Sequence, residues 1–291
     1  MVRTDAHPAA AVLEDNSSPL VKRVFDDIKS ALRVPLVHLV FHDLARYPDF
    51  LELAWRQLHP NVQTVYFEQQ ADFVRARAVE GAAGLGSPLP LDDDGARSTL
   101  KVFHYVNPKL LLAVAALRAA AGGQYPKLEE LPRDAKAQIP TGVPADAATI
   151  TLVNPDAEGP AQPILQEIRA VTGIPSVNSD YRALAQWPEY LVRAWTSLQA
   201  ARAQDAHRSL EREIRLMAEQ AVLVLPFRIE INPHVMRLCG LDEEEIDDVR
   251  ATIERYYRAL PGLVVNMAFL SVGAFGRADA ARSPFPIDLS R

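Results

Sequence analysis

Asp180, Asn107 and Tyr256 are polar residues at positions where the sequence favours an apolar side chain. A carboxylate with an ordinary pKa of about 4 is ionised at pH 7 and can accept a proton. An amide donates and accepts hydrogen bonds at once, so it can hold a small polar molecule beside that carboxylate. A carboxylate, an amide and a phenol around one apolar cleft would therefore suit proton transfer.

An internal repeat singles these residues out. Residues 174–198 align without a gap with residues 34–58 at an offset of 140, and the two segments share prolines, leucines and a tryptophan. Shared residues of this kind describe a scaffold. Where the two copies differ between an apolar and a polar residue, the scaffold did not dictate the choice.

Four such differences stand out. The polar residue is given first in each pair: Asp180 and Val40, Asn107 and Leu260, Tyr256 and Phe103, Asn266 and Ala113. If the two copies pack about an approximate two-fold axis, Asp180 of one copy and Asn107 of the other can converge. Clefts that bind small molecules form readily at such an interface.

Each residue also has a purely structural interpretation. The run Asn178-Ser179-Asp180 precedes a helical stretch, so it could cap that helix and complement its dipole. Asn107 stands before Pro108, which is typical of a helix start. Tyr256 on an apolar helix could be a core residue. The three residues taken together are a stronger signal for a site than any one of them.

Other chemical motifs are weak. His38 and His42 have an i, i+4 spacing that can hold a metal, but there is no HExxH motif and no third ligand, so we expect no metal site. The glycines of residues 81–86 do not follow a strand, which argues against a nucleotide loop. The single cysteine, Cys239, has no neighbouring base and no partner for an internal disulfide.

The bulk composition excludes several classes of function. The chain has 291 residues, a hydrophobic fraction of 48% and a net charge of −6. The acidic balance and the lack of a basic block argue against nucleic-acid binding and against docking to an anionic membrane. No run of 18 residues is apolar throughout, and the N-terminus lacks a signal-peptide pattern. We expect a soluble, cytoplasmic protein.

Helical periodicity dominates and predicts an all-α fold. Residues 17–33 carry apolar residues at helical spacing, with Ser18 as N-cap and Pro19 as the first helical residue. Residues 62–83 and 204–223 each predict a long amphipathic helix.

Two shorter segments carry further local signals. The acidic run at 242–248 predicts a helix start capped by Asp242. Residues 148–154 are a candidate for a short strand.

The repeat sets the expected domain organisation. At offsets of 140 and 153 it extends upstream and downstream, with a Pro-rich connector between the copies that does not predict a packed element. We therefore expect a fused pseudo-dimer made of a first helical repeat (17–119), the connector (120–160), a second helical repeat (161–275) and a non-helical C-terminal tail (276–291).

The segments NSDYRALAQWP (178–188), HYVNPKLLL (104–112) and RSPFPI (282–287) resemble the DehI-type, group I, 2-haloacid dehalogenases. The resemblance spans nearly the whole chain. It implies an all-helical fused pseudo-dimer that needs no cofactor and hydrolyses 2-haloalkanoic acids to 2-hydroxyalkanoic acids with inversion. Some family members accept both enantiomers and some only the D form.

The resemblance also implies roles for individual residues. Asp180 corresponds to the family aspartate that activates a water for direct attack on the halogen-bearing carbon, with no ester intermediate. Asn107 corresponds to the asparagine that helps to hold this water. Ser179 and Tyr256 correspond to a serine and a tyrosine of the substrate pocket.

The pocket lining departs from the family pattern. Leu36 and Leu39 replace a tryptophan and a phenylalanine, and Leu110 replaces a tyrosine. These changes affect the expected substrate size and enantiomer preference more than the reaction class.

The expected partner is a small anionic halo acid, whose carboxylate Ser179 and nearby backbone N–H groups would bind. A homodimer is left open. Two alternatives remain: a related hydrolase acting on a different or larger halo acid, and a non-catalytic helical protein that binds small acids.

Overall fold

The computed structural model describes residues 12–87, 89–125, 132–172 and 176–287, and over these residues it contains helices and no strand. The all-α prediction is therefore confirmed for the described part of the chain. The helices are η1 (Glu14–Asn16), α1 (Pro19–Leu32), α2 (Leu39–Leu44), α3 (Pro48–Val62), α4 (Val65–Ala82), α5 (Asp94–Ala121), η2 (Arg133–Lys136), α6 (Gln162–Thr172), α7 (Ser179–Leu184), α8 (Pro188–Arg202), α9 (Asp205–Val222), α10 (Pro233–Leu238), α11 (Glu243–Phe275) and α12 (Arg277–Ala280).

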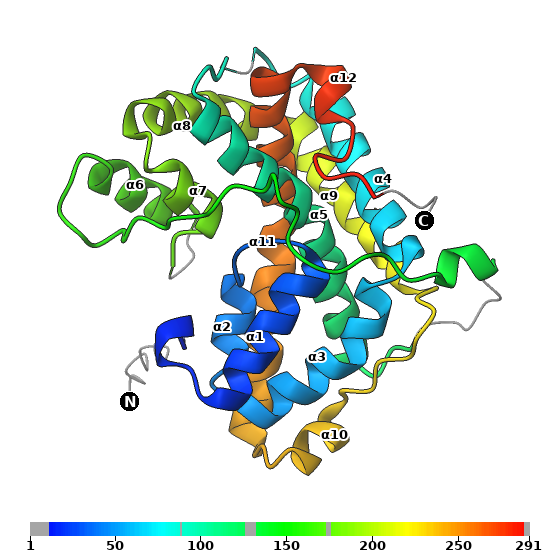
Figure 1. Ribbon diagram of the computed structural model, residues 1–291. Coiled ribbons are helices and arrows are strands. Elements are labelled where there is room, and N and C mark those ends of the chain that lie inside the picture. The colour runs from blue at the N-terminus through cyan, green and yellow to red at the C-terminus, as the bar shows by residue number, and fades with distance from the viewer. Residues whose placement is uncertain (1–11, 88, 126–131, 173–175, 288–291) are drawn as a thin grey trace.

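The two longest helices, α5 and α11, run side by side through the middle of the molecule (Figure 1). Helices α1, α2 and α3 lie at one end of this pair, α6, α7 and α8 at the other, and α4 and α9 pack together along one side. The short helices reach across the sequence: α7 contacts α5, and α2 contacts α11. Residues from distant parts of the chain are thereby brought to the central pair.

Helix boundaries recur along the chain. Helices α2, α3 and α4 reappear as α7, α8 and α9 with both ends of each helix displaced by 140 residues. The helices predicted over 62–83 and 204–223 are present as α4 and α9. Helix α4 begins at Val65 because the Thr64 hydroxyl accepts a hydrogen bond from the Phe67 N–H, which caps the first turn.

Two predicted helix starts are confirmed. Ser18 is the N-cap of α1 and accepts a hydrogen bond from the Val21 N–H, and Pro19 is the first helical residue. Asp242 caps α11 in a capping box with Glu245. Both starts depend on contacts within four residues, which is why the sequence predicts them well.

The strand expected at residues 148–154 is not formed. The segment runs along α7 and has no partner strand in the part of the chain that the structure describes. The Val153 N–H donates to the Arg182 carbonyl, and the Arg182 side chain donates back to the Val153 carbonyl at 3.0 Å. The helix α7 supplies the hydrogen bonds that a neighbouring strand would have supplied.

The connector is more closely attached to the core than its composition suggests. Part of it forms η2, Ile139 is buried, and its N–H donates to the Gln63 carbonyl at 2.8 Å. The C-terminal tail differs from its expectation in the short helix α12, whereas residues 282–287 are not helical, as expected.

Helices α5 and α11 are long and apolar enough to cross a membrane by length and composition alone. The protein interior explains their apolar character, because 94% of the most apolar 18-residue window of α5 is buried, and 67% of that of α11. These helices form the hydrophobic core.

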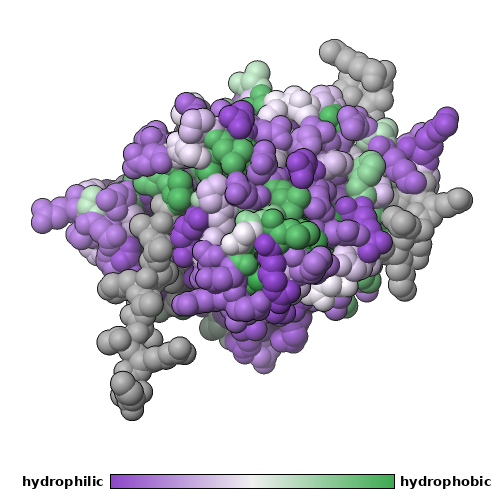
Figure 2. Space-filling view, turned by 90° about the horizontal axis from the view of Figure 1, so that it is seen from below, coloured by the Kyte–Doolittle hydropathy of each residue, from purple (hydrophilic) through white to green (hydrophobic). Residues whose placement is uncertain are grey.

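Figure 2 shows the surface at the end of the molecule near α10. Hydrophobic residues occur there in small groups separated by hydrophilic ones. Single exposed apolar residues, such as Leu238 on α10, are common on soluble surfaces and mark no particular site.

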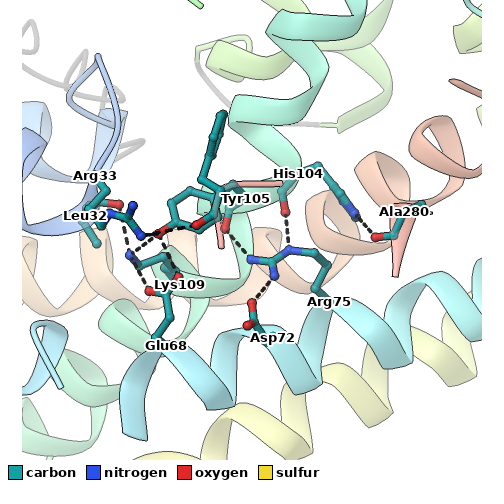
Figure 3. Close-up of polar contacts among 10 residues, drawn as sticks. Leu32, Arg33, Glu68, Asp72, Arg75, His104, Tyr105, Lys109 and Ala280 are labelled. Carbon is teal, nitrogen blue, oxygen red and sulfur yellow. Dashed lines mark hydrogen bonds and ion pairs between the residues drawn. The ribbon is translucent and has the colours of Figure 1, made fainter. Parts of the chain in front are cut away.

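A proline inside α5 creates a demand for hydrogen-bond donors. Pro108 lacks an N–H, so the carbonyl of His104, four residues earlier, loses its helical partner. The fully buried Arg75 of α4 meets this demand (Figure 3): its guanidinium donates to the carbonyl oxygens of His104 at 3.2 Å and Tyr105 at 3.0 Å, and it also pairs with Asp72. Arg75 therefore supports α5 next to Asn107.

One turn further along α5, Lys109 is completely buried (Figure 3). Its ammonium group lies 2.9 Å from the Glu68 carboxylate, and it donates to the Leu32 carbonyl and to the Tyr105 hydroxyl at 3.1 Å each. Burial alone would raise the pKa of Glu68, but Lys109 and Tyr105 outweigh this effect and lower it. Polar contacts thus tie α1, α4 and α5 together on this side.

We expect Arg75→Met to lower the free energy of unfolding by about 3 kcal/mol, because it leaves buried carbonyl groups without donors. Urea unfolding followed by circular dichroism measures this change. The matched control is Arg77→Met on the same helix, whose ion pair with Glu213 is partly exposed and is worth less than about 1 kcal/mol. Equal effects of the two substitutions would contradict the role assigned to Arg75.

Candidate active site

Asn107 and Asp180 are in direct contact. The Asn107 side-chain amide donates to Asp180 Oδ1 at 2.6 Å, although the two residues are 73 positions apart. Both side chains are buried, with exposed fractions of 1% and 3%. The structure therefore brings together the carboxylate and the amide that the repeat comparison selected.

Two helices position this pair. Asn107 lies in the middle of α5, one residue before Pro108, and Asp180 is the second residue of α7, which packs against α5. The interpretation of Asn107 as a helix start is therefore wrong, because α5 continues through the proline. Asn178 occupies the N-cap position of α7, yet its side chain makes no capping hydrogen bond there.

Burial changes the acidity of Asp180. Removal from water penalises the charged carboxylate and raises the pKa of Asp180 to about 6 from its ordinary value of 3.8. The Asn107 amide and a backbone N–H of Asp180 itself act in the opposite direction, because they stabilise the charged form. The group is thus mainly ionised at pH 7 and is a better proton acceptor than an exposed aspartate.

A small cavity borders the pair. Its volume is about 20 Å³, which is enough for roughly one water molecule. The lining residues come from both ends of the molecule and from both central helices: His38, Leu39, Val40, Asn107, Leu110, Asn178, Ser179, Asp180, Tyr256, Ala259, Leu260 and Leu263.

Most of the predicted binding residues reach this cavity. Ser179, Leu39, Leu110 and Tyr256 line it, whereas Leu36 is buried but is not one of the lining residues. The prediction that Leu36 contacts the substrate is therefore not supported by its position. The site is apolar on most sides, which strengthens electrostatic interactions within it.

The hydroxyl of Tyr256 is already engaged. It donates to Asp43 Oδ2 at 2.8 Å, and the same carboxylate oxygen accepts from Arg255 at 3.3 Å. Burial, together with the nearby Asp43 charge, raises the pKa of Tyr256, so the phenol stays protonated. Tyr256 thus presents its ring to the cavity while its hydroxyl anchors α11 to α2.

Two cavity residues were missed by the sequence analysis as parts of this site. His38 is buried, and neither of its ring nitrogens has a hydrogen-bond partner among the described residues; the same is true of the Asn178 side-chain oxygen. Burial, assisted by His42, lowers the pKa of His38 to about 3, so its imidazole is neutral at pH 7. The two residues are related by the offset of 140, but both are polar, so the contrast in polarity that selected Asp180 does not select them.

Comparisons with known proteins identify the family. The model of the family described as "Halocarboxylic acid dehydrogenase DehI" matches residues 35–181. This match includes Asn107 and Asp180 and covers more than half of the sequence. The chain belongs to the DehI family.

Characterised relatives cover nearly the whole chain. An (R)-2-haloacid dehalogenase of Pseudomonas putida is 27% identical over 88% of this chain and 89% of its own length. A configuration-inverting 2-haloacid dehalogenase of Alcaligenes xylosoxydans xylosoxydans is 28% identical over 92% of this chain and 94% of its own. A solved D-2-haloacid dehalogenase complex with L-LA has the same fold, with a TM-score of 0.85 and 24% identity over 91% of this chain and 96% of its own.

We expect Asp180→Asn to stabilise the protein at pH 8 by about 3 kcal/mol. The wild-type carboxyl has a raised pKa in the folded state, so its favourable contribution is present below pH 4 and is lost as the pH rises through 6. The advantage of Asn should therefore shrink as the pH falls from 8 to 4. Urea unfolding of both proteins across this range measures it.

The exposed connector residue Asp146 provides the control. Asp146→Asn should change the free energy of unfolding by a similar small amount at every pH. A difference between Asp180→Asn and wild type that did not vary with pH would contradict the burial of a charged carboxyl.

Proposed function

We propose that this protein hydrolyses 2-haloalkanoic acids to 2-hydroxyalkanoic acids. The observation that carries the proposal is the buried Asn107–Asp180 pair beside a cavity of the size of a water molecule. Membership of the DehI family and the 2-haloacid dehalogenase relatives support the reaction class.

In the proposed reaction, Asp180 is the general base. It accepts a proton from a water held next to it, and the water oxygen forms a bond to the α-carbon as the carbon–halogen bond breaks. The bonding electrons leave with the halide. Attack opposite the leaving group inverts the configuration, and no ester with Asp180 forms.

Asn107 is the positioning residue for this water. Its amide group holds Asp180 Oδ1 and still offers an oxygen to a neighbouring molecule. General-base assistance contributes typically about 10²–10⁴ in rate, and holding the reactants in an attack geometry contributes up to roughly 7–11 kcal/mol. A factor of 10²–10⁴ corresponds to about 2.7–5.5 kcal/mol, so placement of the water is expected to matter more than its deprotonation.

The remaining polar groups of the cavity have complementary tasks. The substrate carboxylate must be kept away from Asp180 and can accept hydrogen bonds from Ser179. Neutral His38 has one ring N–H to offer to the departing halide. The leucines at positions 39 and 110 exclude competing water from the reacting carbon.

The recurrence of helices along the chain supports a further part of the proposal, which concerns the architecture. We infer a fused pseudo-dimer of two helical repeats (17–119 and 161–275), because equivalent helices recur at a fixed offset and the short helix of each half contacts the long helix of the other. Five pairs of cavity residues are related by the offsets of 140 or 153: His38 and Asn178, Leu39 and Ser179, Val40 and Asp180, Asn107 and Leu260, Leu110 and Leu263. We further expect a cytoplasmic protein that needs no cofactor, and a homodimer remains an expectation from the sequence alone.

A substrate larger than the short halo acids is the alternative left by the leucines that replace family aromatic residues. A non-catalytic acid-binding protein would be stabilised by such acids without converting them.

We expect purified protein to release chloride from D- or L-2-chloropropionate. Asp180→Ala and Asp180→Asn should lower kcat by at least about 10²-fold, because both remove the base. Asn107→Ala should lower kcat while Asp180 remains. Ion chromatography of chloride and chiral analysis of the 2-hydroxypropionate measure these outcomes.

Labelled water separates direct attack from an ester route. In one turnover in H₂¹⁸O, label should enter the hydroxy acid and not the Asp180 side chain, as peptide mass spectrometry would show. Full activity of Asp180→Ala, or label in the Asp180 carboxylate, would sink the mechanism.

The pH profile of kcat/KM should have an acid limb near pH 6, because protonated Asp180 cannot accept a proton. Below this pH the value should fall about tenfold per pH unit. Asn107→Ala removes a group that lowers the pKa of Asp180, so the limb of this variant should move to higher pH. A limb at pH 4 in both proteins would rule out Asp180 as the titrating base.

A further inference from the structure

A second pocket lies next to the Asp180 cavity and differs from it in charge. It has a volume of about 450 Å³. We name it the arginine vestibule and define it by Arg202, Arg255, Arg258, Glu211, Asn178 and Asn266. Three guanidinium groups face one carboxylate there, in a chain whose net charge is −6.

The vestibule shares a wall with the Asp180 cavity. Asn178, Ala259 and Leu263 line both spaces, so the vestibule and the water-sized cavity are neighbours. The unpartnered side-chain oxygen of Asn178 lies in this wall. A small molecule in the vestibule is thus one side chain away from the catalytic pair.

Arg202, the last residue of α8, is the cation in the vestibule best prepared for an incoming anion. Its guanidinium lies 5.3 Å from the centre of the Trp195 ring, and its buried Nη1 has no hydrogen-bond partner among the described residues. Stacking on an aromatic ring fixes the direction of a guanidinium and leaves its edge free to donate.

The other two arginines each pair with a carboxylate that does not line the vestibule. Arg255 lies 3.3 Å from Asp43, but Asp43 also accepts the Tyr256 hydroxyl. Arg258 pairs with Glu254 at the surface, with its side chain 73% exposed.

A chain of buried hydrogen bonds holds the inner wall. Asn266 donates to the Tyr181 hydroxyl at 2.9 Å and shares a hydrogen bond of 3.0 Å with His207, whose other ring nitrogen lies 3.5 Å from Glu211. The Glu211 carboxylate is packed against Gly262, where an added Cβ would lie 2.6 Å from its oxygen. These contacts turn the one acidic group of the vestibule toward His207 and keep it in place.

The equivalent positions of the first half are apolar or aromatic. Residues 140 or 153 positions earlier than Arg202, Arg255 and Arg258 are Val62, Val102 and Tyr105, which are all buried. The fold is thus compatible with uncharged side chains here. The arginines therefore call for an explanation other than packing.

We propose that the arginine vestibule is an anion-binding site that takes small carboxylates from solvent toward Asp180 and returns the halide and the hydroxy acid. This inference rests on the proposed function for its substrate, since a 2-halo acid carries a carboxylate that the acidic protein as a whole repels. A local cluster of cations overcomes this repulsion and raises association rates by about 10–10³-fold at low ionic strength. Salt screens such attraction.

The test compares Arg202→Gln with wild type and with Arg193→Gln, an exposed arginine on the same helix outside the vestibule. With 2-chloropropionate at about 10 mM ionic strength, Arg202→Gln should lower kcat/KM about tenfold, mainly through a higher KM. The difference should nearly vanish at an ionic strength of about 1 M. Arg202→Lys should recover most of the loss, and Arg193→Gln should match wild type.

A second measurement does not depend on activity. Crystals soaked in sodium bromide should show anomalous scattering from bromide beside Arg202 in wild type and none there in Arg202→Gln. Values of kcat/KM for Arg202→Gln within twofold of wild type at low salt, or no bromide at Arg202, would overturn the vestibule while leaving the proposed reaction intact. An inactive wild type that still binds bromide at Arg202 would overturn the reaction and retain the anion site.

Discussion

The proposed chemistry depends on keeping one carboxylate away from water without letting it become permanently neutral. Asp180 has almost no contact with solvent, which by itself would favour the protonated acid. The Asn107 amide opposes this tendency from another helix, at 2.6 Å. The balance leaves a base whose pKa is about 6. Any change that separates α5 from α7 would upset it.

Buried polar contacts hold α5 in place next to Asn107. On one side of α5, Arg75 donates to the His104 carbonyl left free by Pro108 and to the Tyr105 carbonyl, and Lys109 with Glu68 joins α5 to α4. Asn107 lies on the same short stretch of helix, so its position is set by a densely bonded neighbourhood. A buried network of this kind is costly when one member is lost, and it therefore favours a single arrangement.

Local signals in the sequence predicted local structure well. Ser18 with Pro19, and Asp242 with Glu245, defined helix starts through contacts between near neighbours. Residues 148–154 do not form the strand considered for them, because backbone groups of this segment make hydrogen bonds with α7, which lies later in the chain. A proline usually interrupts a helix, so Asn107 before Pro108 could be interpreted as a helix start. The sequence does not show that Arg75, 33 positions before Pro108, supplies the missing hydrogen-bond donor and lets α5 continue.

Part of the site could also be predicted from the sequence, but for a different reason. Comparing the two copies selected Asp180 and Asn107 because polarity differs there while the scaffold is kept. The same comparison passed over His38 and Asn178, since both are polar and the pair shows no contrast. Leu36 was selected by the family resemblance alone, and residue type does not show whether a buried leucine lines the cavity or packs beside it.

The raised pKa of Asp180 has a consequence for a cell that uses the proposed reaction. Replacing halogen by hydroxyl liberates one equivalent of strong mineral acid, so catalysis acidifies its own surroundings. A base that titrates near 6 stops working as this acid accumulates. The rate of the proposed reaction would thus fall as its own product acid lowered the local pH. The amount of halo acid converted would then depend on the buffering capacity of the surroundings.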